Sequence, residues 1–332
     1  MSNPAPTTPE SASTGNPKSK PALITIVSLL ITVAAIVWFF GIETRFGGAR
    51  DTSVFGWLRS AWNAETDYEH GILFPFVIIG LIVYQLKNLR AVAGQGSWLG
   101  LIAVLLGAVY YVISYRTFQP RIAAGGLPFI LWGGAYFLWG WQVARILIFP
   151  LFFFWLAIPL PSFQQATTHL QLLATSLAHH GSGLFGVETR VVGTTILPVH
   201  GDWKPLDIAT GCSGIRSLMA LLMISSAWAY VAKIKLWQKA LLFLSALPLA
   251  IIGNALRVIS IFVIAEYGDA EWAATTWHDW SGLLLFYPFS LFLLLVLHSI
   301  FEGGLPWKKN SKRRLTRQTV KAKEESVFIP ES

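Results

Sequence analysis

The feature that most constrains this chain is a series of long apolar runs separated by short polar segments. A helix needs roughly 20 mostly apolar residues to cross the core of a bilayer. About eight runs approach that length, near residues 22–41, 69–86, 98–115, 126–143, 146–161, 216–232, 238–257 and 282–301. Only 13% of the residues are charged, about half the share found in soluble domains. The sequence therefore predicts an all-α polytopic integral membrane protein with about eight transmembrane helices.

The basic residues predict an orientation for these helices. Segments rich in Lys and Arg precede the first run and follow the second, fourth, sixth and eighth runs. Because basic loops stay in the cytoplasm, both chain ends are expected there. Segments 42–68, 162–215 and 258–281 then lie on the outer face of the plasma membrane, and only the loop with Arg116 and Arg121 breaks the pattern. The net charge of +8 is therefore expected to meet membrane lipid rather than nucleic acid.

Three parts of the chain are expected. Residues 1–20 are rich in Pro, Ser and Thr and are predicted to form a disordered cytoplasmic tail. Residues 21–302 form the transmembrane domain, and residues 303–332 form a basic cytoplasmic tail. Within the domain, 162–186 has mixed polarity and is expected to be an interfacial helix. Two extended runs flank His200-Gly201-Asp202 within 189–209, which predicts a small β-hairpin on the outer face, before Gly211.

The only cysteine of the chain, Cys212, lies in the segment GCSGIRS before an apolar run. One cysteine excludes an internal disulfide and a zinc site built from several cysteines. A position near the N-terminus of a helix favours a thiolate, because unpaired N–H groups and the helix dipole point there. Arg216 adds positive charge on the same face, and Ser213 and Gly214 make an apolar setting less probable. The alternative is that Cys212 is a small buried hydrophobic residue.

Arg257 lies in GNALRVIS at the edge of an apolar run, and Asn254 shares its helical face. A guanidinium there is able to donate hydrogen bonds to a developing oxyanion or to a substrate carbonyl. The alternative is a side chain that snorkels to the membrane interface.

His278 lies in TTWHDWSG before the last run, where it could act as base for a thiol and as acid for a leaving amine. Asp279 is adjacent, but neighbouring side chains on a helix diverge, so it need not orient His278. The alternative is an interfacial histidine in an aromatic belt. Tyr68 and His70, in DYEHGILFP, are candidates for contact with a substrate or an acceptor, or equally interfacial residues.

No cofactor or metal site is expected. The chain lacks a Walker motif, a Rossmann glycine pattern and an HExxH motif, and the adjacent His179 and His180 point in different directions on a helix.

Cys212, Arg257 and His278 come from three separate segments that are all predicted at the same outer interface. A Cys–His pair with a cation is the minimum equipment for acyl transfer through a thioester, to water, an amine or a hydroxyl. A rival from another class is a non-enzymatic transporter or exopolysaccharide-assembly subunit. A transporter should carry polar groups or helix breaks near the middle of the bilayer, and Gly253-Asn254 is the nearest approach to one.

The segments GCSGIRS, GNALRV and WHDWSG, in this order and near the ends of apolar runs, resemble the exosortase/archaeosortase family. DYEHGILFP resembles the early Tyr-x-His-Gly segment of that family, and the resemblance runs from about residue 25 to residue 302. It implies an integral-membrane cysteine transpeptidase. Cys212 would be the nucleophile, Arg257 the cation for the transition state or substrate, and His278 the general acid and base.

The resemblance also implies a substrate class. Family substrates are exported proteins with a C-terminal sorting signal of the PEP-CTERM type: a short motif such as Pro-Glu-Pro, a membrane helix and a basic cluster. Cleavage near the motif is expected outside the membrane, followed by transfer to an acyl acceptor that the sequence does not identify. In bacteria the family is associated with exopolysaccharide production.

Overall fold

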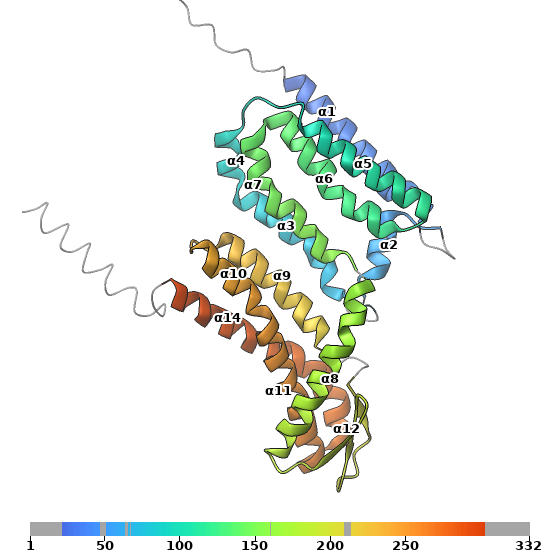
Figure 1. Cartoon of the computed structure of the whole chain (residues 1–332), viewed down its shortest axis with the longest axis vertical. Helices are drawn as coiled ribbons and strands as arrows, with labels where there is room; N and C mark the ends of the chain where they lie inside the picture. Colours follow the sequence, from blue (N-terminus) through green and yellow to red (C-terminus); the bar gives the residue numbers. More distant parts are fainter. Residues whose placement is uncertain are drawn as a thin grey trace, which may run out of the picture.

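The computed structural model describes residues 22–46, 51–63, 66, 68–159, 161–208 and 214–302. Both expected tails and the pair Cys212 and Ser213 lie outside these residues. Helices make up most of the described chain, and Figure 1 shows them as two groups along the long axis, followed by a small β-sheet.

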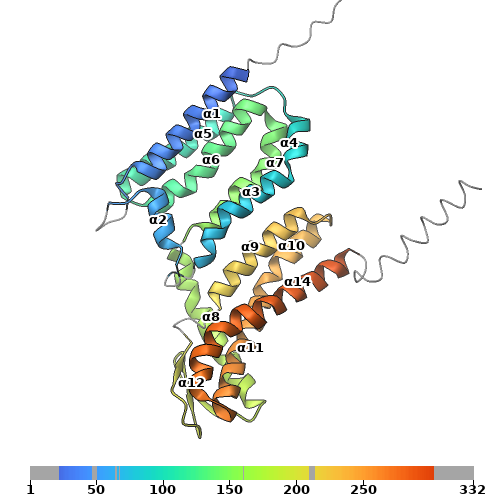
Figure 2. The same cartoon turned by 180° about the vertical axis from the view of Figure 1, so that it is seen from behind.

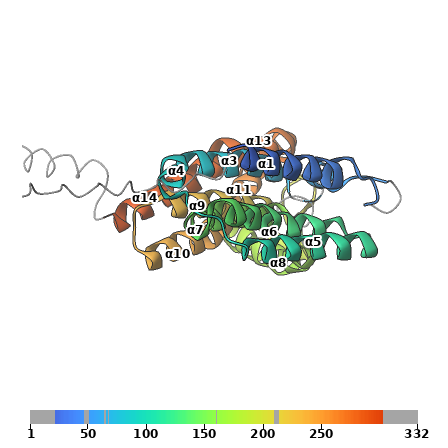
Figure 3. The same cartoon turned by 90° about the horizontal axis from the view of Figure 1, so that it is seen from above.

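The N-terminal group holds the helices that precede residue 160. Seen from above, α1, α3 and α4 form one layer and α5, α6 and α7 form the other (Figure 3). The elements are α1 (Ala22–Ile36), π-helical η1 (Val37–Ile42), α2 (Val54–Ala61), 3₁₀-helical η2 (Glu69–Leu73), α3 (Phe74–Tyr84), α4 (Leu86–Val92), α5 (Gly100–Thr117), α6 (Pro120–Trp139), α7 (Trp141–Phe152) and 3₁₀-helical η3 (Phe153–Ala157).

Glycines bring the backbones of α5 and α6 into direct contact. A Cβ atom added to Gly133 would lie 2.6 Å from the carbonyl oxygen of Gly100, and one added to Gly126 would lie 2.9 Å from that of Gly107. In each helix the two glycines are seven residues apart, so they share one face. Membrane helices use small residues in this way to pack closely where no water drives their association.

The second group holds the helices and strands that follow residue 160. Figure 2 shows α9 and α10 beside α14, with α8, α11 and α12 near the sheet. The elements are α8 (Pro161–Gly183), β1 (Thr189–Val192), β2 (Thr195–Pro198), β3 (Leu206–Asp207), α9 (Ile215–Val231), α10 (Leu236–Leu244), α11 (Ala246–Tyr267), α12 (Ala270–Trp272), π-helical η4 (Ala273–Trp277), α13 (His278–Ser281), π-helical η5 (Gly282–Phe286) and α14 (Tyr287–Phe301).

The three strands form an antiparallel sheet in the order β1-β2-β3. The segment around His200 connects β2 to β3, but the run before it, predicted as one extended segment, is two strands. The chain reverses at Gly193, whose φ of +63° is readily available only to glycine. Buried residues of the sheet region, α8 and α11 pack together: Ala174, Ala178, Val187, Ile196, Trp203, Ile208, Val258 and Phe262. This packed region is called the sheet cap below.

Among the described residues, three helical stretches are long and apolar enough to cross a membrane: Gly100–Thr117, Pro120–Trp139 and Leu236–Tyr267. The stretches Glu69–Tyr84 and Leu86–Val92, bent by 54°, would make a fourth if they form one span. Shorter apolar helices lie at Ile26–Ile42, Trp141–Ala157, Ile215–Val231 and Tyr287–Phe301. Helices therefore occupy all eight apolar runs, while the count of eight spans stays a prediction.

The sequence left one helix boundary open and placed another differently from the structure. The course of residues 258–268 could not be predicted; α11 continues through them to Tyr267, and no Gly or Pro interrupts the chain before Gly268. The last helical stretch begins at Ala270 instead of 282, where the Asp269 carboxylate accepts a hydrogen bond from the Trp272 N–H at 2.9 Å. Arg257 and His278 therefore both lie within helices.

Candidate active site

Gly214 sets the start of α9, directly after Cys212 and Ser213, which lie outside the described residues. Its φ of +77° is in the left-handed region, which glycine adopts without strain. The backbone carbonyl of Gly214 accepts hydrogen bonds from the Leu218 N–H and from the Ser217 hydroxyl, both at 2.8 Å. The second glycine of GCSGIRS, Gly214, is therefore required by the turn that leads into α9.

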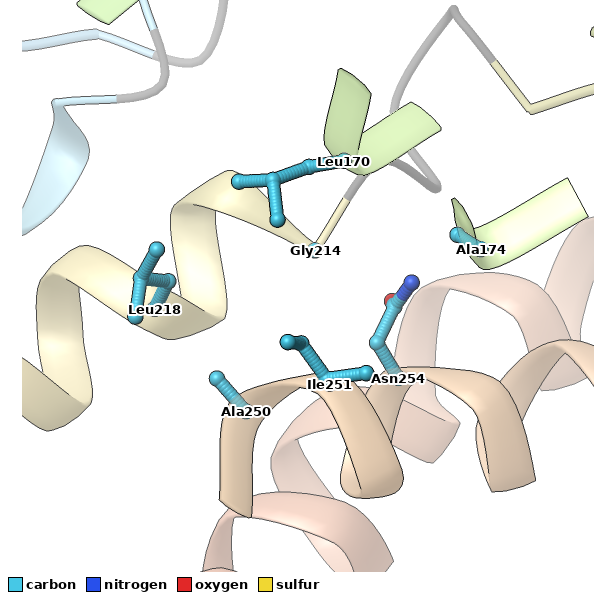
Figure 4. Close-up of a pocket in the computed structure, with 7 residues that line it drawn as sticks. All are labelled: Leu170, Ala174, Gly214, Leu218, Ala250, Ile251 and Asn254. Carbon is cyan, nitrogen blue, oxygen red and sulfur yellow. The ribbon is translucent and has the colours of Figure 1, made fainter. Parts of the chain in front are cut away.

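Asn254 of α11 packs directly against Gly214. A Cβ atom on Gly214 would lie 3.0 Å from Cγ of Asn254 and 3.1 Å from its Nδ2, and the amide is buried. Figure 4 shows Asn254 pointing from α11 towards Gly214, with Leu170 and Ala174 of α8 beside them. The void between these helices is about 10 Å³, on the order of a single water molecule. Three helices thus close around Asn254 and hold it at the start of α9.

Arg257, one turn after Asn254, is partly buried and has a specific partner. Its Nη2 donates a hydrogen bond to the backbone carbonyl of His278 at 2.7 Å. Gly282 lies next to the guanidinium, since a Cβ atom there would be 3.8 Å from Cζ and Nε. Arg257 therefore joins α11 to the last helical stretch.

The stretch that carries His278 is irregular. One α-helical turn, His278–Ser281, lies between the π-helical segments Ala273–Trp277 and Gly282–Phe286. In π-helical geometry the backbone pairing shifts from i→i+4, which frees carbonyl groups for side-chain donors, and such segments are frequent at functional sites. Arg257 and the Ser281 hydroxyl (3.4 Å) both donate to the His278 carbonyl.

The imidazole of His278 contacts Asp279. Its Nδ1 lies 2.9 Å from Oδ1 of Asp279, whose side chain is 76% exposed, whereas that of His278 is 21% exposed. The sequence did not require this contact, because neighbouring side chains on a helix usually diverge. When the neutral ring carries its proton on Nδ1, the Nδ1–H group donates a hydrogen bond to the carboxylate and the free lone pair of the ring is on Nε2. That tautomer is suited to a general base.

A cavity of about 260 Å³ brings these segments together, and it is called the site cavity below. The residues that line it come from η2, α9, α11 and the last helical stretch: Glu69, Gly214, Arg216, Ser217, Ala250, Gly253, Asn254, Arg257, Asp279, Gly282, Phe286, Tyr287 and Ser290. Across it, Nη1 of Arg216 lies 3.6 Å from Oε1 of Glu69. The lining therefore combines apolar groups with charged side chains of both signs.

Tyr68 and His70 lie beside the site cavity, and the residue between them, Glu69, lines it. Both rings are buried and stacked, with centroids 5.6 Å apart. Tyr68 packs against Ile215 and Met219 of α9. Neither ring nitrogen of His70 has a hydrogen-bond partner among the described residues. Tyr68 therefore packs against the start of α9, and His70 stacks on Tyr68.

Glu69, Ser217, Tyr287 and Ser290 line the site cavity but were not identified from the sequence. Glu69 had a usable signal, because a carboxylate at the start of an apolar run is costly unless a cation pairs with it. The other three carry no charge, and hydroxyl groups are common in membrane helices. Within the described part of the chain, no group of three or more His, Cys, Asp and Glu side chains is placed to hold a metal ion.

The sequence matches one family model, described as transmembrane exosortase, over residues 62–296. The matched range contains every candidate site residue from Tyr68 to Asp279 and every residue that lines the site cavity. No curated protein and no solved structure matches the chain.

Proposed function

The chain belongs to the transmembrane exosortase family, and we propose that it is a membrane-embedded cysteine peptidase or transpeptidase. It cleaves the C-terminal sorting signal of exported proteins through a thioester and transfers them to an acceptor. Cys212 is the nucleophile, His278 the general acid and base, and Arg257 the cation that stabilises the oxyanion. The observation that carries the proposal is the site cavity: Gly214, two residues after Cys212, lines it together with Arg257 and Asp279.

In the first half-reaction the Cys212 thiolate attacks the carbonyl carbon of the scissile peptide bond. Negative charge develops on the carbonyl oxygen, where Arg257 is able to stabilise it by hydrogen bonding. The C–N bond then breaks, a C–S thioester bond remains, and the leaving amine takes a proton from His278. The Asp279 carboxylate, 2.9 Å from Nδ1, supports the protonated ring during this step.

In the second half-reaction an acceptor attacks the thioester. An amine, a hydroxyl group or water gives its proton to Nε2 of His278, and the Cys212 thiolate leaves. Water as acceptor makes the protein a protease, and an amine or hydroxyl makes it a transpeptidase. Each reaction regenerates the starting state, so the chemistry needs no cofactor.

The proposed reaction takes place on the outer face of the plasma membrane, with both chain ends in the cytoplasm. Support comes from the basic segments, which alternate with the segments that hold Cys212 and His278. A membrane-impermeant maleimide tests this orientation, because Cys212 is the only thiol of the chain. Labelling in intact cells supports an outer site, and labelling only after permeabilisation contradicts it.

The function is tested with a tagged secreted reporter that ends in a Pro-Glu-Pro-type motif, a membrane helix and a basic cluster. The reporter is co-expressed with the wild-type chain or with Cys212→Ala at equal levels. Shortening by the wild type alone supports the proposal, and the mass of the new C-terminus then separates hydrolysis from transfer. Equal shortening by both variants would show that Cys212 is not the nucleophile. A panel of reporters from neighbouring genes that all stay intact would favour the non-enzymatic rival.

A further inference from the structure

One face of α9 is incompletely covered along the whole helix. Its residues follow the spacing of three and four that places side chains on one side of a helix: Ser217, Ala220, Ile224, Ala227 and Val231. Four of these side chains are partly buried and Val231 is 38% exposed, whereas Leu218 and Leu221, on another face, are buried. We call this face, with the two cavities at its ends, the α9 groove.

The first end of the α9 groove is the site cavity, where Ser217 lies beside Glu69 of η2 and Ser290 of α14. The second end is a cavity of about 540 Å³ with a mostly apolar lining. Its residues come from α3, α9, the segment after α9, and the end of the last helical stretch: Val77, Leu81, Met223, Ile224, Ala227, Trp228, Val231, Ala232, Lys233, His298 and Glu302.

The same three helical segments bound both cavities. η2 and α3 contribute Glu69 at the first end and Leu81 at the second, so they form one wall. η5 and α14 contribute Tyr287 at the first end and His298 at the second, so they form the other wall. Figure 2 shows α3 and α14 on either side of α9. The two cavities therefore lie towards opposite ends of α9 and between the same two walls. We call the region between these walls, with α9 as its floor, the trough.

The dimensions of the trough fit a membrane-spanning helix. α9 has 17 residues, which at 1.5 Å per residue span about 25 Å, close to the roughly 30 Å core of a bilayer. The floor carries Ser217, Ala220 and Ala227, and small residues allow a neighbouring helix to approach closely.

We propose that the α9 groove binds the transmembrane helix of the sorting signal, with the cleavage motif in the site cavity. This inference rests on the proposed function and adds where the substrate lies. A helix in the trough places the residues before it next to Gly214 and Arg257, where the reaction occurs. Its other end reaches the cavity that Lys233, His298 and Glu302 line, where the Glu302 carboxylate lies 3.6 Å from Nε2 of His298 and can also attract the basic cluster that follows the substrate helix.

Binding of the substrate helix along the full length of α9 would both select the substrate and speed its cleavage. The lipid-embedded helix fixes the depth of the scissile bond, which raises its effective concentration at the nucleophile. The fit of a substrate helix then depends mainly on its length and on the size of the residues at its contact face. The exact residue types elsewhere in the helix matter less.

Photo-cross-linking tests the inference in the full-length chain. p-Benzoylphenylalanine replaces Ala227 on the groove floor or, as a control, Ala108 on the exposed side of α5. Both variants carry Cys212→Ala, so that bound reporter is not cleaved, and are irradiated with the tagged reporter in membranes. We expect an adduct of chain and reporter from position 227 and none from position 108.

Each other outcome has a defined meaning. A chain–chain adduct from position 227 would show that a second copy fills the groove, and an adduct with lipid alone would show that the groove holds lipid; either overturns the inference. Equal reporter adducts from both positions would also overturn it. Shortening by the wild type without an adduct from position 227 overturns the groove alone. An adduct without Cys212-dependent shortening overturns the peptidase function alone.

A bulky side chain gives a second test in the active chain. Ala227→Trp should slow reporter shortening about 10- to 100-fold, because a displaced substrate helix misplaces the scissile bond. Ala108→Trp should leave it unchanged. Maleimide labelling of Cys212 at the wild-type rate in both variants would show that the site itself is intact. Unchanged shortening by Ala227→Trp would count against the groove.

Discussion

Arg257 and His278 are joined through the backbone: the guanidinium donates from Nη2 to the carbonyl oxygen of His278 at 2.7 Å. This bond links α11 to the irregular stretch between two π-helical segments. Nε of Arg257 is buried and has no hydrogen-bond partner among the described residues. One side chain therefore holds the backbone of His278 through Nη2 while its Nε–H has no partner among the described residues.

The several N–H donors of the Arg257 guanidinium should be needed for activity as well as its positive charge. Arg257→Lys keeps the charge but cannot hold the His278 carbonyl and donate to an oxyanion in the same geometry. We expect Arg257→Lys and Arg257→Gln both to slow reporter shortening about 100-fold or more. Initial rates of shortening at equal enzyme levels measure this. Near wild-type activity of Arg257→Lys would mean that charge alone is sufficient.

Asp279 should act by orienting His278 rather than by touching the substrate carbonyl. Asp279→Asn replaces the carboxylate that accepts from Nδ1 with an amide that can stabilise either tautomer. Because Asp279 is exposed, we expect a rate loss of about 10- to 100-fold, smaller than in a buried triad. Asp279→Glu should recover part of the rate. If Asp279→Asn shortens the reporter as fast as the wild type, His278 has another orienting group.

Gly214→Ala should slow reporter shortening for two separable reasons. Its φ of +77° costs a residue with a side chain roughly 1–2 kcal/mol, and the new methyl would lie 3.0 Å from Asn254. Gly193→Ala is the matched control, with φ of +63° but open space around the Cβ position. We expect Gly193→Ala to stay active and Gly214→Ala to lose at least about tenfold in rate.

The double variant Gly214→Ala/Asn254→Ala removes the crowding and keeps the backbone strain. Partial recovery of reporter shortening relative to Gly214→Ala would assign the loss to crowding. No recovery would assign it to strain or to a direct role of Asn254, which Asn254→Ala alone distinguishes.

The α5–α6 contact should tolerate no side chain at its glycines. Gly133→Leu places carbon atoms where the Gly100 carbonyl lies, and overpacking of this kind costs about 1–3 kcal/mol or more. The adjacent Gly134 has open space at its Cβ position and provides the control. We expect Gly133→Leu to lower the midpoint of thermal unfolding in detergent and Gly134→Leu to leave it nearly unchanged. Equal midpoints would contradict the backbone contact.

Much of the helical architecture could be predicted from hydrophobicity. The apolar runs of the sequence coincide with helices because an apolar segment in lipid must satisfy its backbone internally. The start of α9 at Gly214 also followed from local chemistry, since polar residues precede the glycine and apolar residues follow it. These features depend on short segments, so one sequence is enough.

The features that were missed depend on contacts between segments. The last ten residues of α11, after Arg257, pack in the sheet cap, so their helical course depends on contacts with distant segments as well as on the absence of Gly and Pro. The reversal at Gly193 was hidden because TRVV and TILP read as one extended run. The π-helical geometry around His278 and the position of Glu69 beside Arg216 also follow from tertiary packing.

Because α11 runs without a break from Arg257 into the sheet cap, contacts in the sheet cap fix the rotation of α11 about its axis and so the direction of the Arg257 side chain. A helix turns by about 100° per residue, so a small twist of α11 about its axis would carry the guanidinium away from His278. Two contacts far from the site cavity oppose such a twist: Trp203 Nε1 donates to Glu266 at 2.8 Å, and the Tyr267 hydroxyl donates to the Phe185 carbonyl at 3.0 Å. The rotation of α11 that places Arg257 beside His278 is thereby set at the far end of the same helix, by two loops of the sheet region that do not line the site cavity.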